Sequence, residues 1–252
     1  MFKRLIAAAA AALMFSCTAT KPPPSPPPSD ARTFPQVPAV PLPLGDVPPP
    51  GWPAPGNYRI DSSQSELRLL VYRAGALASL GHNHVIQNRS VNGSIDVAPT
   101  LAASSFSFSA AVSAFVVDDS QARIEEGEDF STDVSDSAKL GTFNNMTGAA
   151  LLNAQKYPVI SVRSVRVEDL HGAPTATVIV GVAGRESSLM FPFVLHKETY
   201  GLSATATFEL NQSAIGLTPF SLMMGALAVR DTMVVKLKVI AVLEGPRLGT
   251  PR

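Results

Sequence analysis

Two histidines lie two positions apart in the segment Leu80-Gly81-His82-Asn83-His84, and their type and spacing suit metal chemistry. In an extended backbone, side chains at i and i+2 point to the same side, so one strand can supply two metal ligands. A third ligand would have to come from elsewhere in the chain: His171, His196, Asp231 or the acidic residues 118–136. The competing interpretation is structural, because Gly81 and Asn83 favour a turn in which polar side chains hydrogen-bond the loop.

Other patterns that would indicate an enzyme are absent from the sequence. Nucleophilic hydrolysis needs a Ser or Cys beside a His and an orienting acid, and no G-x-S-x-G elbow occurs. Adjacent acids in a polar run, such as Asp118-Asp119 and Glu125-Glu126, more often face solvent than each other. Neither a P-loop nor a G-x-G-x-x-G motif is present. We therefore expect a protein that is not an enzyme and carries no catalytic residues.

The overall composition excludes several classes of protein. The chain has 20 Lys plus Arg and 20 Asp plus Glu, so it carries no excess positive charge for binding a nucleic acid. One Cys among 252 residues rules out a disulfide framework and any CxxC site. No apolar run reaches the roughly 18 to 20 residues of a transmembrane helix.

The N-terminus has the pattern of a secretory signal peptide over residues 1–17. Lys3 and Arg4 precede an apolar stretch, residues 5–15, that is too short to span a bilayer. The end of this stretch, Ser16-Cys17, resembles the lipobox of bacterial lipoproteins, which predicts lipidation of Cys17. Thr18 follows in place of the inner-membrane retention Asp, so the resemblance implies a periplasmic lipoprotein anchored in the outer membrane. The alternative is ordinary cleavage near Ser16 with Cys17 unmodified.

A proline-rich linker follows over residues 18–56. Residues 21–56 contain 15 of the 22 prolines, a composition typical of semi-rigid polyproline II structure. The folded domain is predicted over residues 57–245, and residues 246–252 form a short tail.

Period-two alternation of apolar and polar residues dominates the predicted domain and indicates β-strands. The run 105–114, with Phe and Ala alternating with Ser, is the clearest example. Eight such runs occur: 67–71, 85–97, 105–114, 159–168, 176–183, 188–196, 203–210 and 235–239. Pro192 places the strand containing it at an edge or a bulge, because proline has no N–H to donate.

Residues 118–157 break the strand pattern. Apolar residues from Leu140 to Ala154 recur at helical spacing, and Pro158 stops the run. The acidic part, 118–136, carries eight acids and one base, Arg123, and is interpreted as a solvated loop or helix face. The prediction is an all-β antiparallel barrel of about eight strands with one helical insertion, a size that can enclose one small apolar ligand.

Several short segments resemble the YceI-like family, whose members are polyisoprenoid-binding proteins of lipocalin-like fold. They occur in the family's order and span residues 57–243: Tyr58-Arg59-Ile60-Asp61 with Ser65, Tyr157-Pro158 to Ser164, Val180 to Gly184, Phe208 to Gly216, Gly225-Ala226-Leu227 and Val229-Arg230-Asp231. Gly81-His82-Asn83-His84 is similar to the GHNH sequence of a subset of this family.

The resemblance implies an extended lipocalin-like barrel whose apolar cavity holds the isoprenoid tail of a quinone or related lipid. It implies no catalytic residue and no cofactor beyond that lipid. His82, Asn83 and His84 are then candidates for contact with the polar head group at the barrel mouth, since neutral His offers one donor and one acceptor. Two alternatives remain: a periplasmic metal-binding module using His82 and His84, and a structural envelope protein without a ligand. Several relatives of this fold occur as dimers, so a homodimer is one possible assembly, but no sequence feature marks a self-complementary surface and the oligomeric state stays open.

Overall fold

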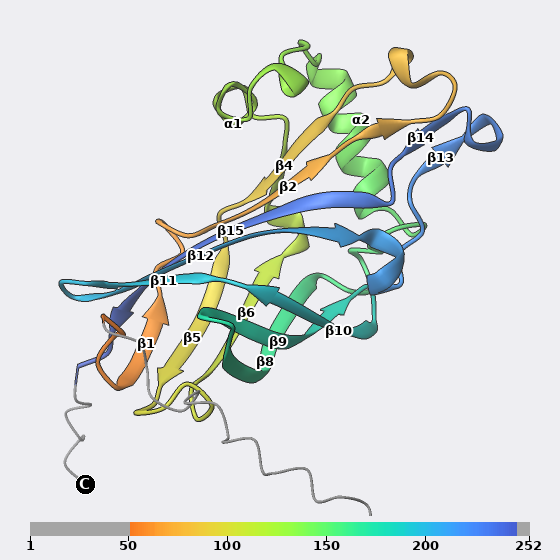
Figure 1. The fold of residues 1–252 in the computed structure, drawn as a ribbon. Coiled ribbons are helices and arrows are strands. Elements are labelled where there is room, and N and C mark those ends of the chain that lie inside the picture. Colours follow the sequence, from red (N-terminus) through yellow and green to blue (C-terminus); the bar gives the residue numbers. More distant parts are fainter. Residues whose placement is uncertain (1–50, 246–252) are drawn as a thin grey trace, which may run out of the picture. The chain divides into compact units, whose positions relative to one another are not determined.

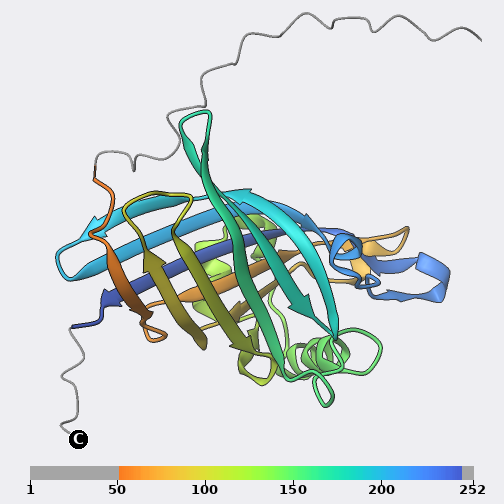
Figure 2. The same cartoon turned by 90° about the horizontal axis from the view of Figure 1, so that it is seen from below.

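The computed structural model describes residues 51–245 (Figures 1 and 2). The expected signal peptide, lipidated Cys17, most of the linker and the tail after residue 245 lie outside the described residues. Within the described part of the chain, no helix is both long and apolar enough to cross a membrane.

One antiparallel sheet of twelve strands forms most of the domain. Its path runs β10-β9-β8-β6-β5-β1-β15-β2-β4-β7, with β12 paired to β15 and β11 paired to β12. The strands are β1 Gly56–Ile60, β2 Glu66–Val71, β4 His84–Asn88, β5 Val91–Val97, β6 Ser105–Ala111, β7 Phe115–Val117, β8 Val159–Leu170, β9 Ala173–Val182, β10 Arg185–Pro192, β11 Val194–Glu198, β12 Gly201–Asn211 and β15 Thr232–Leu243. The predicted all-β antiparallel class is confirmed. The sheet has more strands than the eight expected because two of the runs are each divided into two strands and because β1 and β7 lie outside the runs.

Strand β15 is the central strand of this sheet. One of its edges pairs with β12 over residues 201–211, and the other pairs first with β2 and then with β1. The alternation of Val235, Leu237 and Val239 with lysines places an apolar face inside the curved sheet. This face, together with those of the neighbouring strands, encloses the main apolar core.

The expected closed barrel is wrong, because the ladder of backbone hydrogen bonds does not return to its start. Strand β11 occupies the free edge of β12 only along residues 201–205, and the rest of that edge pairs with no described strand. β10, the last strand of the path, ends at Pro192 as an edge strand, which confirms the position predicted for that proline. Side chains alone bridge β10 and β12.

Tight hairpins connect the long strands β8, β9 and β10. Each loop has two residues, His171-Gly172 and Ala183-Gly184, and all four have positive φ, from 48° to 83°. This is the type I′ turn that suits the twist of a two-residue hairpin. A Cβ at Gly184 would collide with the ring of Tyr157, so glycine is required there for packing as well as for its φ.

Two α-helices, α1 (Ser120–Glu125) and α2 (Asp136–Thr147), lie beside β2 and β4 in Figure 1. Asp119 and Ser135 cap their N-termini, accepting bonds from Ala122 and Ala138 backbone N–H groups at 3.0 and 3.3 Å. The predicted helix is confirmed for α2 but ends at Gly148, whose backbone is extended, and turns carry the chain to Pro158.

Short elements complete the described domain. The 3-10 turns are η1 Ala78–Leu80, η2 Val112–Ala114, η3 Glu128–Phe130, η4 Gln212–Ile215 and η5 Met223–Gly225. A small separate sheet has the order β13-β14-β3, with bounds β3 Arg73–Ala74, β13 Ser221–Leu222 and β14 Leu227–Val229.

The acidic segment packs against the outside of the main sheet and is not simply solvated. Phe130 and Ala122 form a second core with Leu70 and Val85 from β2 and β4. Beside this core, the guanidinium of Arg68 donates hydrogen bonds of 2.6 to 2.9 Å to three glutamates, Glu66, Glu125 and Glu126. Two acids of the segment, Glu125 and Glu126, therefore pair with basic side chains on the outer face of β2 and β15 and hold α1 against the sheet.

Candidate functional site

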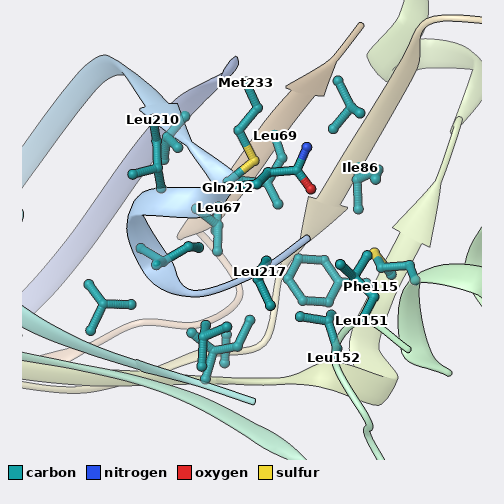
Figure 3. A pocket seen from close by; sticks show the side chains of 18 of the residues that line it. Leu67, Leu69, Ile86, Phe115, Leu151, Leu152, Leu210, Gln212, Leu217 and Met233 are labelled. Carbon is teal, nitrogen blue, oxygen red and sulfur yellow. The ribbon is translucent and has the colours of Figure 1, made fainter. Parts of the chain in front are cut away.

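A largely apolar cavity of about 250 Å³ lies inside the curved sheet. Thirty residues line it, and only four of them are polar: His84, Thr142, Asn145 and Gln212. Figure 3 shows leucines of β2 and β12 facing Phe115 and the leucines of the loop after α2 across this space. The inward face of each strand supplies aliphatic or aromatic side chains, as the period-two pattern predicts. The cavity is close in size to ordinary small-molecule sites, which are about 300 to 1,000 Å³.

A second cavity of about 70 Å³ lies next to the first. Three side chains line both cavities and separate them: Phe108 of β6, Phe191 of β10 and Leu237 of β15. The second cavity extends to Trp52, Ile60 and Leu202 near the start of β1. The two apolar spaces are therefore neighbours separated by these three side chains, a boundary that we call the narrow point.

Polar side chains around the larger cavity come from a few positions. Thr142 and Asn145 project from α2, and His84 begins β4. Gln212 is anchored by its own amide, since Nε2 donates to the carbonyl of Arg230 at 2.8 Å. No charged Asp, Glu, Lys or Arg lines this cavity within residues 51–245. The interior thus suits an uncharged, mostly apolar molecule with one polar end.

The polar group with the most ordered surroundings is His84. Its Nδ1 lies 2.6 Å from Oδ2 of Asp118, and the other oxygen of that carboxylate accepts the Val85 backbone N–H at 2.9 Å. Arg123 donates to the same oxygen. Asp118 itself is fully buried. Burial alone raises the pKa of the Asp118 carboxyl, but the bonds from His84, Val85 and Arg123 outweigh it and lower the pKa below its usual value.

An ionised Asp118 determines which nitrogen of the His84 ring carries the proton. A carboxylate can only accept, so Nδ1 is the protonated nitrogen and donates to it. In the neutral ring, Nε2 is then an acceptor. Because His84 also lines the cavity, it supplies one oriented hydrogen-bonding group at a mostly apolar wall.

Asn83 holds the loop and does not line the cavity. Its side-chain oxygen accepts the Arg73 backbone N–H at 3.0 Å, and its Nδ2 donates to the carbonyl of Asp129 at 2.9 Å. The carbonyl of Asn83 accepts from Arg123 at 2.8 Å, and Arg123 also donates to the carbonyl of Thr132 at 2.7 Å. Asn83 therefore has the role that the structural interpretation gives to the GHNH segment, in which polar groups hydrogen-bond the loop.

His82 and His84 lie near each other, with ring centroids 6.3 Å apart and planes inclined by 61°. His82 is half-buried and is not among the residues that line either cavity of the described domain. Within residues 51–245, no group of three or more His, Cys, Asp or Glu side chains could hold a metal ion. No observation thus favours the metal interpretation, and the predicted role of Cys17 lies outside the described residues.

Sequence reasoning missed Asp118 and Arg123, because both belong to a run interpreted as a solvated surface. One feature of the sequence could have identified this pair. Arg123 is the single base among eight acids over residues 118–136, and an isolated base in such a run indicates an internal ion pair. Asp118 also has a φ of 54°, a conformation uncommon outside glycine, and this backbone turn directs its carboxylate inward.

The short segments that suggested a family resemblance form the structural frame around the cavity. Ser65 bonds the backbone of Ile240 in both directions, and its Oγ accepts the Ile240 N–H at 3.0 Å. Tyr58 is buried and donates to the carbonyl of Ala54 at 2.7 Å. Asp231 accepts from both the backbone N–H and the hydroxyl of Ser213, which joins the two late segments.

Comparison with family models gives a match to the YceI-like domain over residues 58–241. The chain belongs to the YceI-like family. The matched region covers the whole main sheet up to the last residues of β15, so the cavity lies entirely within it. Comparison with curated protein sequences gives no match.

The first of three similar solved structures confirms the fold of this YceI-like chain. The crystal structure of Burkholderia cenocepacia BcnA has a TM-score of 0.54 and 12% identity, covering 73% of this chain and 99% of that one. A polyisoprenoid binding domain from Saccharophagus degradans, described as implicated in plant cell wall breakdown, has a TM-score of 0.49 and 11% identity, covering 74% and 98%. The Campylobacter jejuni YceI protein has a TM-score of 0.44 and 11% identity, covering 64% and 85%.

Proposed function

We propose that this chain is a non-catalytic lipid carrier that holds one long isoprenoid chain in its interior, with the polar end of the lipid near His84. The observation that carries the proposal is the cavity itself, in which 26 of the 30 lining residues are apolar. Membership of the YceI-like family supports an isoprenoid, such as the tail of a quinone or a polyprenyl alcohol.

Apolar burial supplies the affinity in this proposal. Each methylene removed from water contributes about 0.8 kcal/mol, so a tail of a few isoprene units gains enough to offset the cost of association. The wall offers almost no hydrogen-bonding groups away from His84, Thr142, Asn145 and Gln212. The cavity therefore selects its ligand by width and length.

The elongated interior favours a flexible chain over a compact ring system. The larger cavity narrows at Phe108, Phe191 and Leu237 before the second cavity begins. A thin tail fits such a path because it can bend at single bonds, whereas a fused-ring molecule cannot. Tails that fill the larger cavity extend toward this narrow point.

His84 orients the polar end. Its Nδ1 is engaged by Asp118, so its Nε2 accepts a hydrogen bond in the neutral ring. The preferred partner is a hydroxyl group, as in a polyprenyl alcohol or a reduced quinone. A quinone carbonyl cannot donate, so it would bond to His84 only when the ring is protonated.

The site of action follows from the sequence pattern of the N-terminus. We place the carrier in the periplasm, attached to the outer membrane through lipidated Cys17 and held away from it by the proline-rich residues 18–56. Metabolic labelling with a fatty acid, compared between the native chain and Cys17→Ser, tests the anchor independently of the cavity. Label retained by the variant would disprove lipidation at Cys17.

A cavity-filling substitution tests the carrier function. Ala110 of β6 is buried and lines the cavity, whereas Ser107 of the same strand is exposed. We expect the native chain and Ser107→Phe to bind radiolabelled farnesol, a prenol of three isoprene units, with similar affinity. Ala110→Phe fills the space and should weaken binding at least tenfold, with circular dichroism confirming that it is folded. Equal binding by Ala110→Phe and Ser107→Phe would place the lipid elsewhere and overturn the proposal.

A further inference from the structure

Four exposed apolar side chains gather at one end of the domain. Leu222, Met223 and Met224 form the tip of the β13–β14 hairpin, and Leu80 ends η1 in the neighbouring loop. Met224 is fully exposed, and Leu80 and Met223 are 72% and 69% exposed. We call these four residues the apolar tip. Figures 1 and 2 both show the hairpin and the neighbouring loop extending side by side beyond the main sheet.

Backbone bonds hold the two parts of the tip together. Strand β14 pairs with β13 on one side and with β3 on the other. The N–H of Leu77 donates to the carbonyl of Ala226 at 2.8 Å, directly behind the exposed residues. The apolar tip is therefore an ordered surface made from two segments that are about 140 residues apart in sequence. The pairing of β3 with β14 joins these two segments.

The backbone conformation at the hairpin tip is energetically unfavourable for the two methionines that adopt it. Met223 and Met224 have φ values of 50° and 56°, followed by Gly225 at 91°. Glycine or asparagine adopts this left-handed region with less strain, yet two long apolar side chains occupy it and point into solvent. Strain of this kind concentrates at functional surfaces, and burial of the methionines in an apolar medium would offset it.

The distribution of charge around the tip indicates which apolar medium would bury the two methionines. Residues 74–83 and 210–229 contain no Asp, Glu, Lys or Arg. Arginines border both segments: Arg73 bonds the carbonyl of Gly81 at 2.8 Å, and the Arg230 guanidinium lies 5.5 Å from the ring centroid of Tyr72. Asp231, the next residue, is engaged by Ser213. Asp129 and Glu209 act on Tyr72 together with Arg230, so the base of the tip carries charges of both signs. The uncharged apolar end matches the acyl region of a bilayer, and the charged base matches its head-group region.

The apolar tip is also continuous with the cavity. Phe220 and Val229, at the base of the same hairpin, line the larger cavity. We propose that the apolar tip inserts into a lipid bilayer and docks the cavity against the membrane from which the isoprenoid is taken or to which it is delivered. This inference rests on the proposed carrier function, because only a carrier of membrane lipids needs such contact.

Fluorescence from the tip itself tests the inference. In a Trp52→Phe background of the full chain, Met224→Trp places the sole tryptophan at the tip. The matched control is Met190→Trp on β10, where Met190 is 64% exposed. With vesicles of phosphatidylglycerol and brominated phosphatidylcholine, we expect a blue shift and quenching for Met224→Trp and neither for Met190→Trp. Attachment through another part of the chain would affect both proteins equally.

A second pair of variants measures the contribution of the methionines. Met223→Asn with Met224→Asn keeps residues that tolerate a positive φ, and it should weaken vesicle partitioning of the chain at least about tenfold. No quenching of Met224→Trp, or equal quenching of both tryptophans, would overturn membrane docking. A blue shift that grows with protein concentration without vesicles would assign the tip to contact with a second copy instead.

The same samples separate this inference from the carrier function. Farnesol uptake with no tryptophan quenching would disprove docking and leave the carrier intact. Quenching without farnesol uptake would disprove the carrier and leave a membrane-binding tip of another purpose.

Discussion

The rings of Phe191 on β10 and Phe208 on β12 stack with centroids 4.6 Å apart and planes inclined by only 4°. They meet where β10 and β12 lie side by side without backbone pairing, and both line the larger cavity. Side-chain packing thus replaces a hydrogen-bonded ladder at the open side of the sheet. This seam is the place where the wall around a ligand can separate with the least loss of backbone bonds.

Truncation of one ring at this seam should weaken the fold strongly. Phe208→Ala removes the stacked pair and leaves a void, so we expect it to lower the free energy of unfolding by about 3 to 5 kcal/mol. Phe208→Leu keeps most of the volume and should cost less than half as much. Urea unfolding followed by circular dichroism measures both. A loss below about 1 kcal/mol for Phe208→Ala would mean that the stacked pair does not hold the seam.

The narrow point between the two cavities should limit the length of the bound chain. Leu237→Ala removes one of the three side chains that separate them, whereas Lys238→Ala changes the next residue of β15 on the opposite face. We expect Leu237→Ala to shift the preference toward longer prenols in a competition series, and Lys238→Ala to leave it unchanged. An unchanged length profile in Leu237→Ala would show that the second cavity does not receive the tail.

Removing the acceptor at His84 should affect only ligands that carry a hydroxyl group. A hydrogen bond of this kind contributes about 1 kcal/mol, so His84→Phe should bind a prenol about fivefold more weakly. Farnesene, a hydrocarbon of similar length with no polar group, should bind the native chain and the variant equally. Equal losses for both ligands would assign His84 a packing role, and retention of prenol affinity would remove it from the site.

The ion pairs around Asp118 should make stability depend on acid pH. Its pKa is lowered in the folded chain, so its stabilising contribution is complete above the unfolded value, near 3.8, and is lost as pH falls through the folded value. The unfolded chain takes up the proton first, and acid therefore favours unfolding. Asp118→Asn should cost about 3 to 5 kcal/mol at pH 7, because it leaves Arg123 buried without its partner.

The same variant should unfold with a weaker dependence on pH below about pH 4. Asp133→Asn, an exposed position in the same acidic segment, serves as the control and should match the native chain. Thermal unfolding across the acid range measures both variants. Parallel pH profiles for Asp118→Asn and the native chain would show that Asp118 does not govern the acid transition.

Most of the main sheet could be predicted from sequence, because inward and outward residues alternate along each strand. Phe106 and Phe108 of β6 show this clearly, since both face the interior with Ser between them. Local chemistry also identified Pro192 as an edge residue. Both the alternation along a strand and the missing N–H of proline act within a few residues, so they can be read from neighbours in sequence.

The parts that could not be predicted depend on contacts between distant segments. The prediction of a closed barrel was wrong because β11 pairs with only half of the free edge of β12. Amino-acid composition does not reveal how far two strands pair. The burial of Asp118 depends on Arg123 and on His84, 34 residues away. The GHNH segment was selected as a candidate from sequence, but its spacing alone could not show that His84 lines the cavity while Asn83 secures the loop.

Native mass spectrometry tests the central claim of an isoprenoid carrier most directly. The full chain is purified from a bacterial envelope without detergent, and its intact mass is compared with the mass after denaturation. The account predicts an adduct of isoprenoid-lipid mass that is lost on denaturation and is strongly reduced in Ala110→Phe. A bare polypeptide mass for the native chain, or an adduct that Ala110→Phe retains in full, would contradict it.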